Sequence, residues 1–161
     1  MRKIKNPWIQ KEGYNCFGCA PDNPIGLHMH FYEDGEQVVS YWQPQQHFQG
    51  WVGTLHGGII STLIDETAGW VVTRKLQTAG MTSRLNVSFR KPISSEDPQL
   101  TIRAWITARK RNFVEIHVAV ENDKKEICAE AEVTYFAMGE EKAREMGFAH
   151  CDVEEEQLFP F

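Results

Sequence analysis

The 161-residue chain has no run of apolar residues long enough to form a transmembrane helix, and no apolar stretch follows its basic N-terminus as in a secretory leader. Cysteine is also scarce, with four residues. In a chain without a leader, so few cysteines are expected to be thiols rather than a disulfide framework. We therefore expect a soluble protein of the cytoplasm that has no membrane partner.

Positive charge is in short supply as well, because 17 lysine and arginine residues stand against 22 aspartate and glutamate residues and the formal net charge is −5. A general nucleic-acid-binding protein would carry a basic surface, so we expect no nucleic-acid partner. The sequence also has no P-loop, no dinucleotide-binding glycine fingerprint and no HExxH motif. What is present is 42 % hydrophobic residues, which is enough for the core of one ordinary domain.

The pattern of apolar residues divides the chain into three parts. Residues 1–26 hold three prolines and three glycines without a clear period, and we expect them to form an irregular arm. Residues 27–138 are expected to form the folded domain. Residues 139–161 are expected to form a charged tail that contains a short helix over 141–146.

The folded domain contains one helical pattern among several β-like runs. Runs 27–31 and 37–42 flank an Asp-Gly turn and predict a hairpin. A long helix is predicted to begin near Gly57 and to end around 74–77. One buried stripe is expected along it, made by Ile60, Leu63, Ile64, Thr67 and Val71. A four-strand meander is predicted after the helix, over residues 82–90, 100–109, 113–121 and 127–137. A long helix on an antiparallel sheet is an α+β arrangement with a single core.

The start of this helix has the composition of an anion-binding site. Gly57 and Gly58 leave backbone N–H groups open to a ligand at the positive end of the helix dipole. Such donors suit an oxyanion hole for a thioester carbonyl. Asp65 lies seven residues after Gly58 and on the same face, away from the buried stripe.

The rise of the helix constrains how these groups can act together. Seven residues span about 10 Å, whereas a base and an oxyanion donor must meet within roughly 3 Å of one carbonyl. Gly58 and Asp65 of one chain are therefore poorly placed to share a substrate. If both are catalytic, the simplest arrangement is a homodimer in which each chain completes the site of the other.

Three segments of the sequence resemble one known family. They are residues 50–66 (GWVGTLHGGIISTLIDE), residues 82–92 (TSRLNVSFRKP) and the arm from Asn15 to Leu27 with its Cys-Phe-Gly-Cys motif. Together they are similar to the hot-dog thioesterase superfamily, and in particular to its phenylacetate-pathway-like branch. The resemblance spans about residues 15–138.

This resemblance implies a hot-dog fold, in which a curved antiparallel sheet wraps a long helix, paired into a dimer and often a tetramer. It implies hydrolysis of acyl-CoA, with CoA as part of the substrate and no separate cofactor. Asp65 would be the nucleophile or the general base, and the Gly58 N–H, with Gly57, would polarise the thioester carbonyl. His56 would shape the loop, and Thr82 would position water or the carboxylate.

The sequence departs from the family pattern at one loop position. Some relatives have an asparagine six residues before the histidine, where this chain has Gly50. The adjacent Gln49 is the candidate to replace that asparagine as a polar contact near the thioester. The departure keeps a second function open, that of a non-catalytic acyl-CoA-binding protein of the same fold. Glu66 is the second-choice carboxylate. A hot-dog hydratase is disfavoured because Trp70 stands where such enzymes have a histidine.

Basic residues near strand ends are candidate ligands for the phosphates of CoA. These are Arg90 and Lys91 at the end of one strand and Arg111 in a turn, where each can equally be a solvated surface charge.

The pair Cys16 and Cys19 has the C-x2-C spacing of half a zinc site. The other cysteines and histidines that could complete it have no paired spacing: Cys128, Cys151, His28 and His30. His28 and His30 are expected to share one face of a strand. The sequence alone thus gives no complete ligand set, and we expect no metal.

Overall fold

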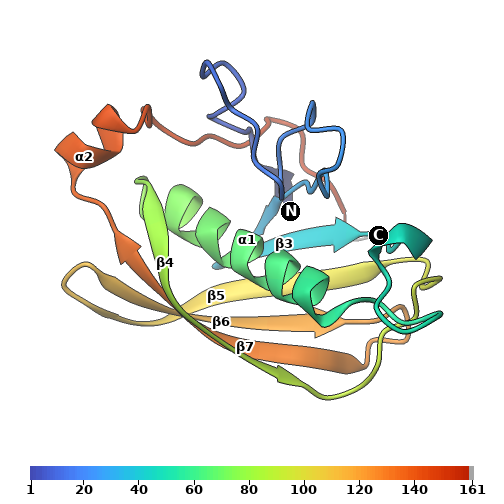
Figure 1. Ribbon diagram of the computed structural model, residues 1–161. Helices are drawn as coiled ribbons and strands as arrows, with labels where there is room; N and C mark the ends of the chain where they lie inside the picture. The colour runs from blue at the N-terminus through green and yellow to red at the C-terminus, as the bar shows by residue number, and fades with distance from the viewer. Residues whose placement is uncertain (160–161) are drawn as a thin grey trace.

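The computed structural model describes residues 1–159 and has one long helix lying against a curved antiparallel sheet (Figure 1). Its elements, in chain order, are β1 (Arg2–Lys3), β2 (Tyr32–Asp34), β3 (Gln37–Trp42), the 3-10 turn η1 (Gln46–Phe48), α1 (Gly57–Lys75), β4 (Gly80–Phe89), β5 (Leu100–Lys110), β6 (Phe113–Glu121), β7 (Ile127–Ala137) and α2 (Glu140–Glu145). The predicted α+β class, the long helix and the later strands are confirmed.

The strand order of the sheet is β1-β2-β3-β5-β6-β7-β4, and every pair is antiparallel. The predicted four-strand meander is therefore wrong in one respect, because only β5, β6 and β7 follow one another. After β3 the chain crosses the sheet through α1, so β4 arrives at the far edge and pairs with β7. This crossing places Thr82 of β4 opposite Tyr135 of β7.

The N-terminal hairpin begins later than the sequence predicts. The first strand covers Tyr32–Asp34 and not 27–31, and Gly35 takes the positive φ of 59° in the predicted turn. His28 has a φ of 52°, which is outside the extended region, so the segment before β2 cannot continue as a strand. The expectation that His28 and His30 share a strand face is consequently wrong.

One stripe of α1 is buried against the sheet. The five residues predicted for it are all buried: Ile60, Leu63, Ile64, Thr67 and Val71. The facing strands contribute β-branched and small residues to the same core, among them Val118 of β6 and Val133 of β7. Among residues 1–159, no helix combines the length and the hydropathy needed to cross a membrane.

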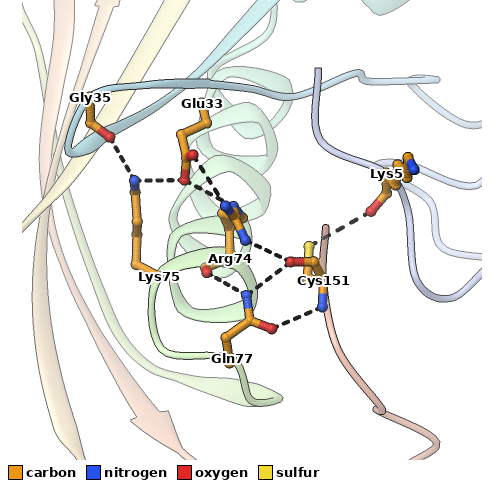
Figure 2. Close-up of polar contacts among 7 residues, drawn as sticks. All are labelled: Lys5, Glu33, Gly35, Arg74, Lys75, Gln77 and Cys151. Atoms are coloured by element: carbon orange, nitrogen blue, oxygen red, sulfur yellow. Dashed lines mark hydrogen bonds and ion pairs between the residues drawn. The ribbon is translucent and has the colours of Figure 1, made fainter. Parts of the chain in front are cut away.

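The β2–β3 hairpin and the tail are tied to the C-terminal end of α1 (Figure 2). The Arg74 Nε and Lys75 Nζ atoms donate to Oε2 of Glu33, at 2.9 and 2.7 Å. Arg74 also donates to the carbonyl oxygen of Cys151 (2.7 Å), and the Gln77 side chain donates to that same oxygen and accepts from the Cys151 N–H. Basic residues at a helix C-terminus also interact favourably with the helix dipole. The tail is thus docked rather than loose.

Glu33 gives this network a pH dependence. Burial acts to raise the pKa of Glu33, but the hydrogen bonds from Arg74 and Lys75 outweigh it and hold the pKa below its ordinary value of 4.5. A lowered carboxyl pKa contributes stability above the unfolded pKa, and that contribution is lost as the pH falls through the folded pKa.

We expect Glu33→Gln to lower the free energy of unfolding by about 1–2 kcal/mol at pH 7, because two cationic donors lose a charged acceptor. Urea unfolding at pH 7, 5, 4 and 3 should show the gap to the wild type closing as the pH falls below about 4.5. Glu36→Gln, at an exposed position of the same hairpin, is the control and should leave stability nearly unchanged. A gap that persists at pH 3 would contradict this role.

Candidate active site

Asp65 is anchored where α1 passes the β4–β7 edge of the sheet. Its Oδ1 atom accepts a hydrogen bond from Thr82 Oγ1 (2.7 Å) and another from Tyr135 OH (2.9 Å). Among residues 1–159, no donor contacts its second oxygen, Oδ2. The structure thus brings Thr82 to Asp65, as the resemblance implies, and leaves one carboxylate oxygen available.

Tyr135 is the residue of this site that sequence reasoning missed. Its hydroxyl also lies 2.8 Å from the backbone carbonyl oxygen of Asp65. Burial, followed by the neighbouring Asp65 charge, raises the pKa of Tyr135, so the phenol stays protonated and acts as a donor. Tyr135 could have been predicted only from its position opposite Thr82 in the sheet, and that position follows from the pairing of β4 with β7.

Gly69 makes room for the Tyr135 hydroxyl. It lies one helical turn after Asp65, and a Cβ atom at this position would be 2.9 Å from Tyr135 OH. Real Cβ atoms essentially never approach a heavy atom so closely. Gly69 therefore allows a strand hydroxyl to reach the backbone of the helix.

The N-terminus of α1 is capped by His56. The His56 Nδ1 atom accepts from the Gly58 N–H at 2.8 Å, so the ring is neutral with its proton on Nε2. The carbonyl oxygen of His56 accepts from the N–H groups of Ile59 and Ile60. In the described chain this leaves the Gly57 N–H as the unpartnered donor of the first helical turn.

A hollow of about 740 Å³ opens beside this helix terminus. His56 and Gly57 line it together with Phe89, Arg90 and Lys91, so two of the predicted basic residues do lie next to the glycines. Each is paired with an acidic residue, Arg90 with Glu130 (3.6 Å) and Lys91 with Glu126 (3.2 Å), and both remain more than half exposed.

Gln49 is occupied within its own loop. Its Oε1 atom accepts from the Gly53 N–H at 2.9 Å, although the residue also lines a second hollow beside His56 and Gly58. A Cβ atom at Gly50 would be 3.4 Å from the His56 ring, so the asparagine of the relatives would contact that ring if placed here.

Two predicted residues lie far from the helix N-terminus. Arg111 is in the β5–β6 turn, which lies at the opposite end of α1 from Arg90 (Figure 1). The helix has 19 residues and is therefore about 28 Å long. Asp65, eight residues after Gly57, is separated from the Gly57 N–H by roughly 12 Å of helix rise. One chain does not bring these groups to a common point.

Glu66 meets different surroundings from Asp65. Its Oε1 atom accepts from Trp70 Nε1 (3.2 Å) and from the Cys16 thiol (3.4 Å) of the arm. Burial, followed by the charge of Cys16, raises the pKa of Glu66 to about 7. Glu66 has no contact with Thr82, so the anchored carboxylate of this site is Asp65.

Comparison with known sequences agrees with the resemblance. Residues 52–129 match a family model described as the thioesterase superfamily. The chain is 41 % identical over 64 residues to the acyl-coenzyme A thioesterase THEM4 of Rattus norvegicus, and equally to that of Mus musculus. The matched segment covers 39 % of this chain and 27 % of each relative, so the chain spans about a quarter of the length of these curated relatives.

Solved structures share the fold. A hypothetical thioesterase from Streptococcus pneumoniae, solved with coenzyme A, has a TM-score of 0.64 and 24 % identity, and the match covers 69 % of this chain and 86 % of that one. The PaaI protein of the E. coli phenylacetic acid degradation operon has a TM-score of 0.64 and 17 % identity, with 70 % and 81 % covered. The hot-dog fold implied by the sequence is thereby confirmed.

We expect the fit between Gly69 and Tyr135 to appear as a coupling in a double-mutant cycle. Gly69→Ala should destabilise the wild type, because the new methyl group overlaps the Tyr135 hydroxyl. In the Tyr135→Phe background the same change should be neutral or stabilising by up to about 1 kcal/mol, the helix preference of alanine over glycine. Urea unfolding of the four proteins gives the coupling energy, which should exceed about 1 kcal/mol. Additive effects would contradict the proposed fit.

Proposed function

We propose that this chain, whose residues 52–129 match the thioesterase superfamily, hydrolyses an acyl-CoA to a free acid and CoA. The observation that carries the proposal is the one-sided anchoring of Asp65. Thr82 and Tyr135 both bind Oδ1, which fixes the carboxylate while Oδ2 keeps its lone pairs for water or for a thioester carbonyl.

The reaction needs one acceptor for a proton and one donor for the developing oxyanion. Oδ2 of Asp65 takes a proton from water as the water oxygen bonds to the thioester carbon. The tetrahedral intermediate then collapses, the C–S bond breaks, and the CoA sulfur leaves as the proton returns to it. Direct attack uses the same geometry: Oδ2 bonds to the thioester carbon, the C–S bond breaks, and CoA leaves as a thiolate that takes a proton from solvent. Water then hydrolyses the mixed anhydride to the free acid and the Asp65 carboxylate.

The oxyanion donor in this proposal is chiefly the Gly57 N–H. The Gly58 N–H, predicted first from the sequence, is held by His56 Nδ1, whereas Gly57 faces the hollow without a partner in the described chain. A backbone N–H at the positive end of a helix suits a thioester carbonyl that gains negative charge. The His56 ring, whose Nδ1 accepts from Gly58, orients this terminus, and its Nε2, which has no partner among residues 1–159, is available to the substrate.

The proposed site is shared between two copies, and β4 supplies the interface. Among residues 1–159, β4 pairs with β7 alone, so its other edge is open. It also exposes apolar side chains, with Met81, Leu85 and Phe89 at 60 %, 37 % and 55 % exposure. An open edge that carries exposed apolar residues favours pairing with another strand.

The position of β4 explains why such pairing would complete the site. Thr82, near one end, binds Asp65, while Phe89, at the other end, lies against Gly57. If two β4 strands pair antiparallel about a two-fold axis at Asn86, the extra residue in β4 between Thr82 and Arg84 brings Thr82 of one copy beside Phe89 of the other. Gly57 of the second copy then lies beside Asp65 of the first, which removes the separation imposed by the helix rise.

Arg90 and Lys91 are the proposed ligands for the CoA phosphates. They line the hollow that contains Gly57, and both guanidinium and ammonium groups bind phosphate oxygens. The hypothetical thioesterase of S. pneumoniae was solved with coenzyme A, which is consistent with this ligand class. A cytoplasmic location remains part of the proposal, supported by four cysteines that are all free thiols.

We expect Asp65→Asn to lower kcat by at least about 100-fold, because the amide cannot accept a proton from water. Gly57→Pro should lower it by about 100- to 1000-fold, because proline at the first helical position keeps the helix but removes the N–H donor. His56 is extended, as a residue before proline must be, and Gly57→Ala keeps the N–H and is the matched control.

The assay is the release of free thiol from short, medium, long-chain and aromatic acyl-CoAs. Saturable binding of acyl-CoA by the wild type without thiol release would overturn the hydrolase and favour an acyl-CoA-binding protein. Full activity of Asp65→Asn would remove Asp65 from the mechanism.

The shared site predicts the effect of blocking β4. Leu85→Glu should convert the dimer to monomers and abolish hydrolysis, because two carboxylates would meet near the two-fold axis. Ile127→Glu, at a 43 % exposed position of β7, is the control and should leave both mass and activity unchanged. Multi-angle light scattering measures the mass.

Mixing subunits tests the sharing itself. An equimolar mixture of Asp65→Asn and Gly57→Pro chains should recover about one quarter of the wild-type activity, because each mixed dimer has one intact site. A monomeric wild type, or a mixture that recovers nothing after subunit exchange, would contradict the shared site.

A further inference from the structure

A second cluster of reactive side chains lies where the arm meets α1. The Sγ atoms of Cys16 and Cys19 and a carboxylate oxygen of Glu66 all lie within 4.8 Å of one another. From this cluster we infer that Cys16, Cys19 and Glu66 bind a zinc ion. Neither the thioester chemistry nor the fold requires such a site.

The distance between Cys16 and Glu66 fits two ligands of one tetrahedral ion, and Cys19 lies within reach of both. Zinc binds sulfur at about 2.3 Å and carboxylate oxygen at about 2.0–2.2 Å, so a sulfur and an oxygen on the same ion lie about 3.5 Å apart. Cys16 Sγ and Glu66 Oε1 are 3.4 Å apart. Three protein ligands leave the fourth position for water.

The backbone after Cys16 forms a tight turn. The Ala20 N–H donates to the carbonyl oxygen of Cys16 (3.1 Å), which turns the Cys-Phe-Gly-Cys segment back on itself and brings the two sulfurs together. A Cβ atom at Gly18 would lie 2.5 Å from the Glu66 Cδ atom. Glycine at this position is therefore what admits the carboxylate to the cysteine loop.

Further donors surround the ligand atoms. The Tyr14 hydroxyl lies 2.9 Å from Cys19 Sγ and accepts from Asn6 Nδ2, so its own proton is available to a thiolate at Cys19. Trp70 Nε1 donates to Glu66 Oε1. Hydrogen bonds from such outer groups orient metal ligands and support their deprotonated forms.

In its metal-binding form the cluster lacks a countercharge from the protein. With both thiols deprotonated, two thiolates and a carboxylate carry three negative charges, and across residues 1–159 no lysine, arginine or histidine forms an ion pair with Glu66. Lys11 lines the same hollow, but its ammonium donates to the carbonyl oxygen of Met146. A divalent ion offsets two of the three charges.

A hollow of about 430 Å³ gives an ion and its water access to the site. Tyr14, Cys16, Cys19 and Glu66 all line it. On binding, Zn²⁺ replaces the two thiol protons, which pass to solvent, and the metal–ligand bonds join the arm to α1 at the residue after Asp65. The ion would thus cross-link the N-terminal arm to the helix that carries the proposed active site.

Titration of reduced, metal-stripped protein with Co²⁺ tests the site independently of any enzymatic activity. We expect one equivalent per chain, with the near-ultraviolet absorption of thiolate-to-cobalt charge transfer, and we expect Zn²⁺ to displace the Co²⁺. Cys16→Ser and Glu66→Gln should each weaken binding at least about tenfold. Gly18→Ala should weaken it too, because its methyl group displaces Glu66.

Cys128→Ala is the matched control, since it removes a buried thiol outside the cluster and should leave the titration unchanged. Circular dichroism of each variant distinguishes the loss of a metal ligand from the loss of folding. If a cysteine variant unfolds, Glu66→Gln, which keeps the side-chain shape, is the variant that tests the site. A reduced wild type without the charge-transfer absorption would overturn the zinc site. Absorption that survives Cys16→Ser, or disappears in a folded Cys128→Ala protein, would overturn it as well.

Discussion

The burial of a single stripe of α1 against the sheet fixes the rotation of the helix, and the remaining features of the molecule depend on that rotation. Once Ile60, Leu63 and Ile64 are buried, the residues that follow have no freedom in what they face. Asp65 meets the hydroxyls of the β4–β7 edge, and Glu66, about 100° further round, meets the cysteines of the arm. The packing of one helix face therefore places the adjacent carboxylates Asp65 and Glu66 in different chemical surroundings.

The same helix also separates what it carries. Its N-terminus holds the Gly57 N–H, which has no partner among residues 1–159, and its middle holds the anchored Asp65. The helix therefore keeps donor and acceptor about 12 Å apart within one chain. Among residues 1–159 the outer edge of β4 is open, and its two ends lie beside these two groups, with Thr82 near Asp65 and Phe89 near Gly57. In the proposed dimer the two-fold axis exchanges the ends of β4 and so brings together the groups that the helix holds apart.

The arm and the tail complete the surface of α1 that the sheet leaves uncovered. Arg74, Lys75 and Gln77 secure the C-terminal end of the helix to Glu33 and Cys151 (Figure 2), while the cysteine loop packs at its middle around Glu66. A zinc ion at that loop would link the arm directly to α1, in addition to the hydrogen bond between Cys16 and Glu66. The arm is thus part of the environment of the active-site helix.

The sequence by itself determined the features that depend on local periodicity. The 3.6-residue spacing of Ile60, Leu63, Ile64, Thr67 and Val71 was sufficient for the helix and its buried face, and β-branched and aromatic content was sufficient for the later strands. The His-Gly-Gly segment likewise indicated a helix terminus with open donors. Only the tertiary structure decided which strand β4 pairs with, and hence that Tyr135 reaches Asp65 and that Gly69 must be small. It also decided that His56 occupies the Gly58 N–H and that Glu66 joins two cysteines from the arm. Contacts between residues distant in sequence depend on how helices and strands pack together. The spacing of apolar residues within one element does not specify which other element it packs against.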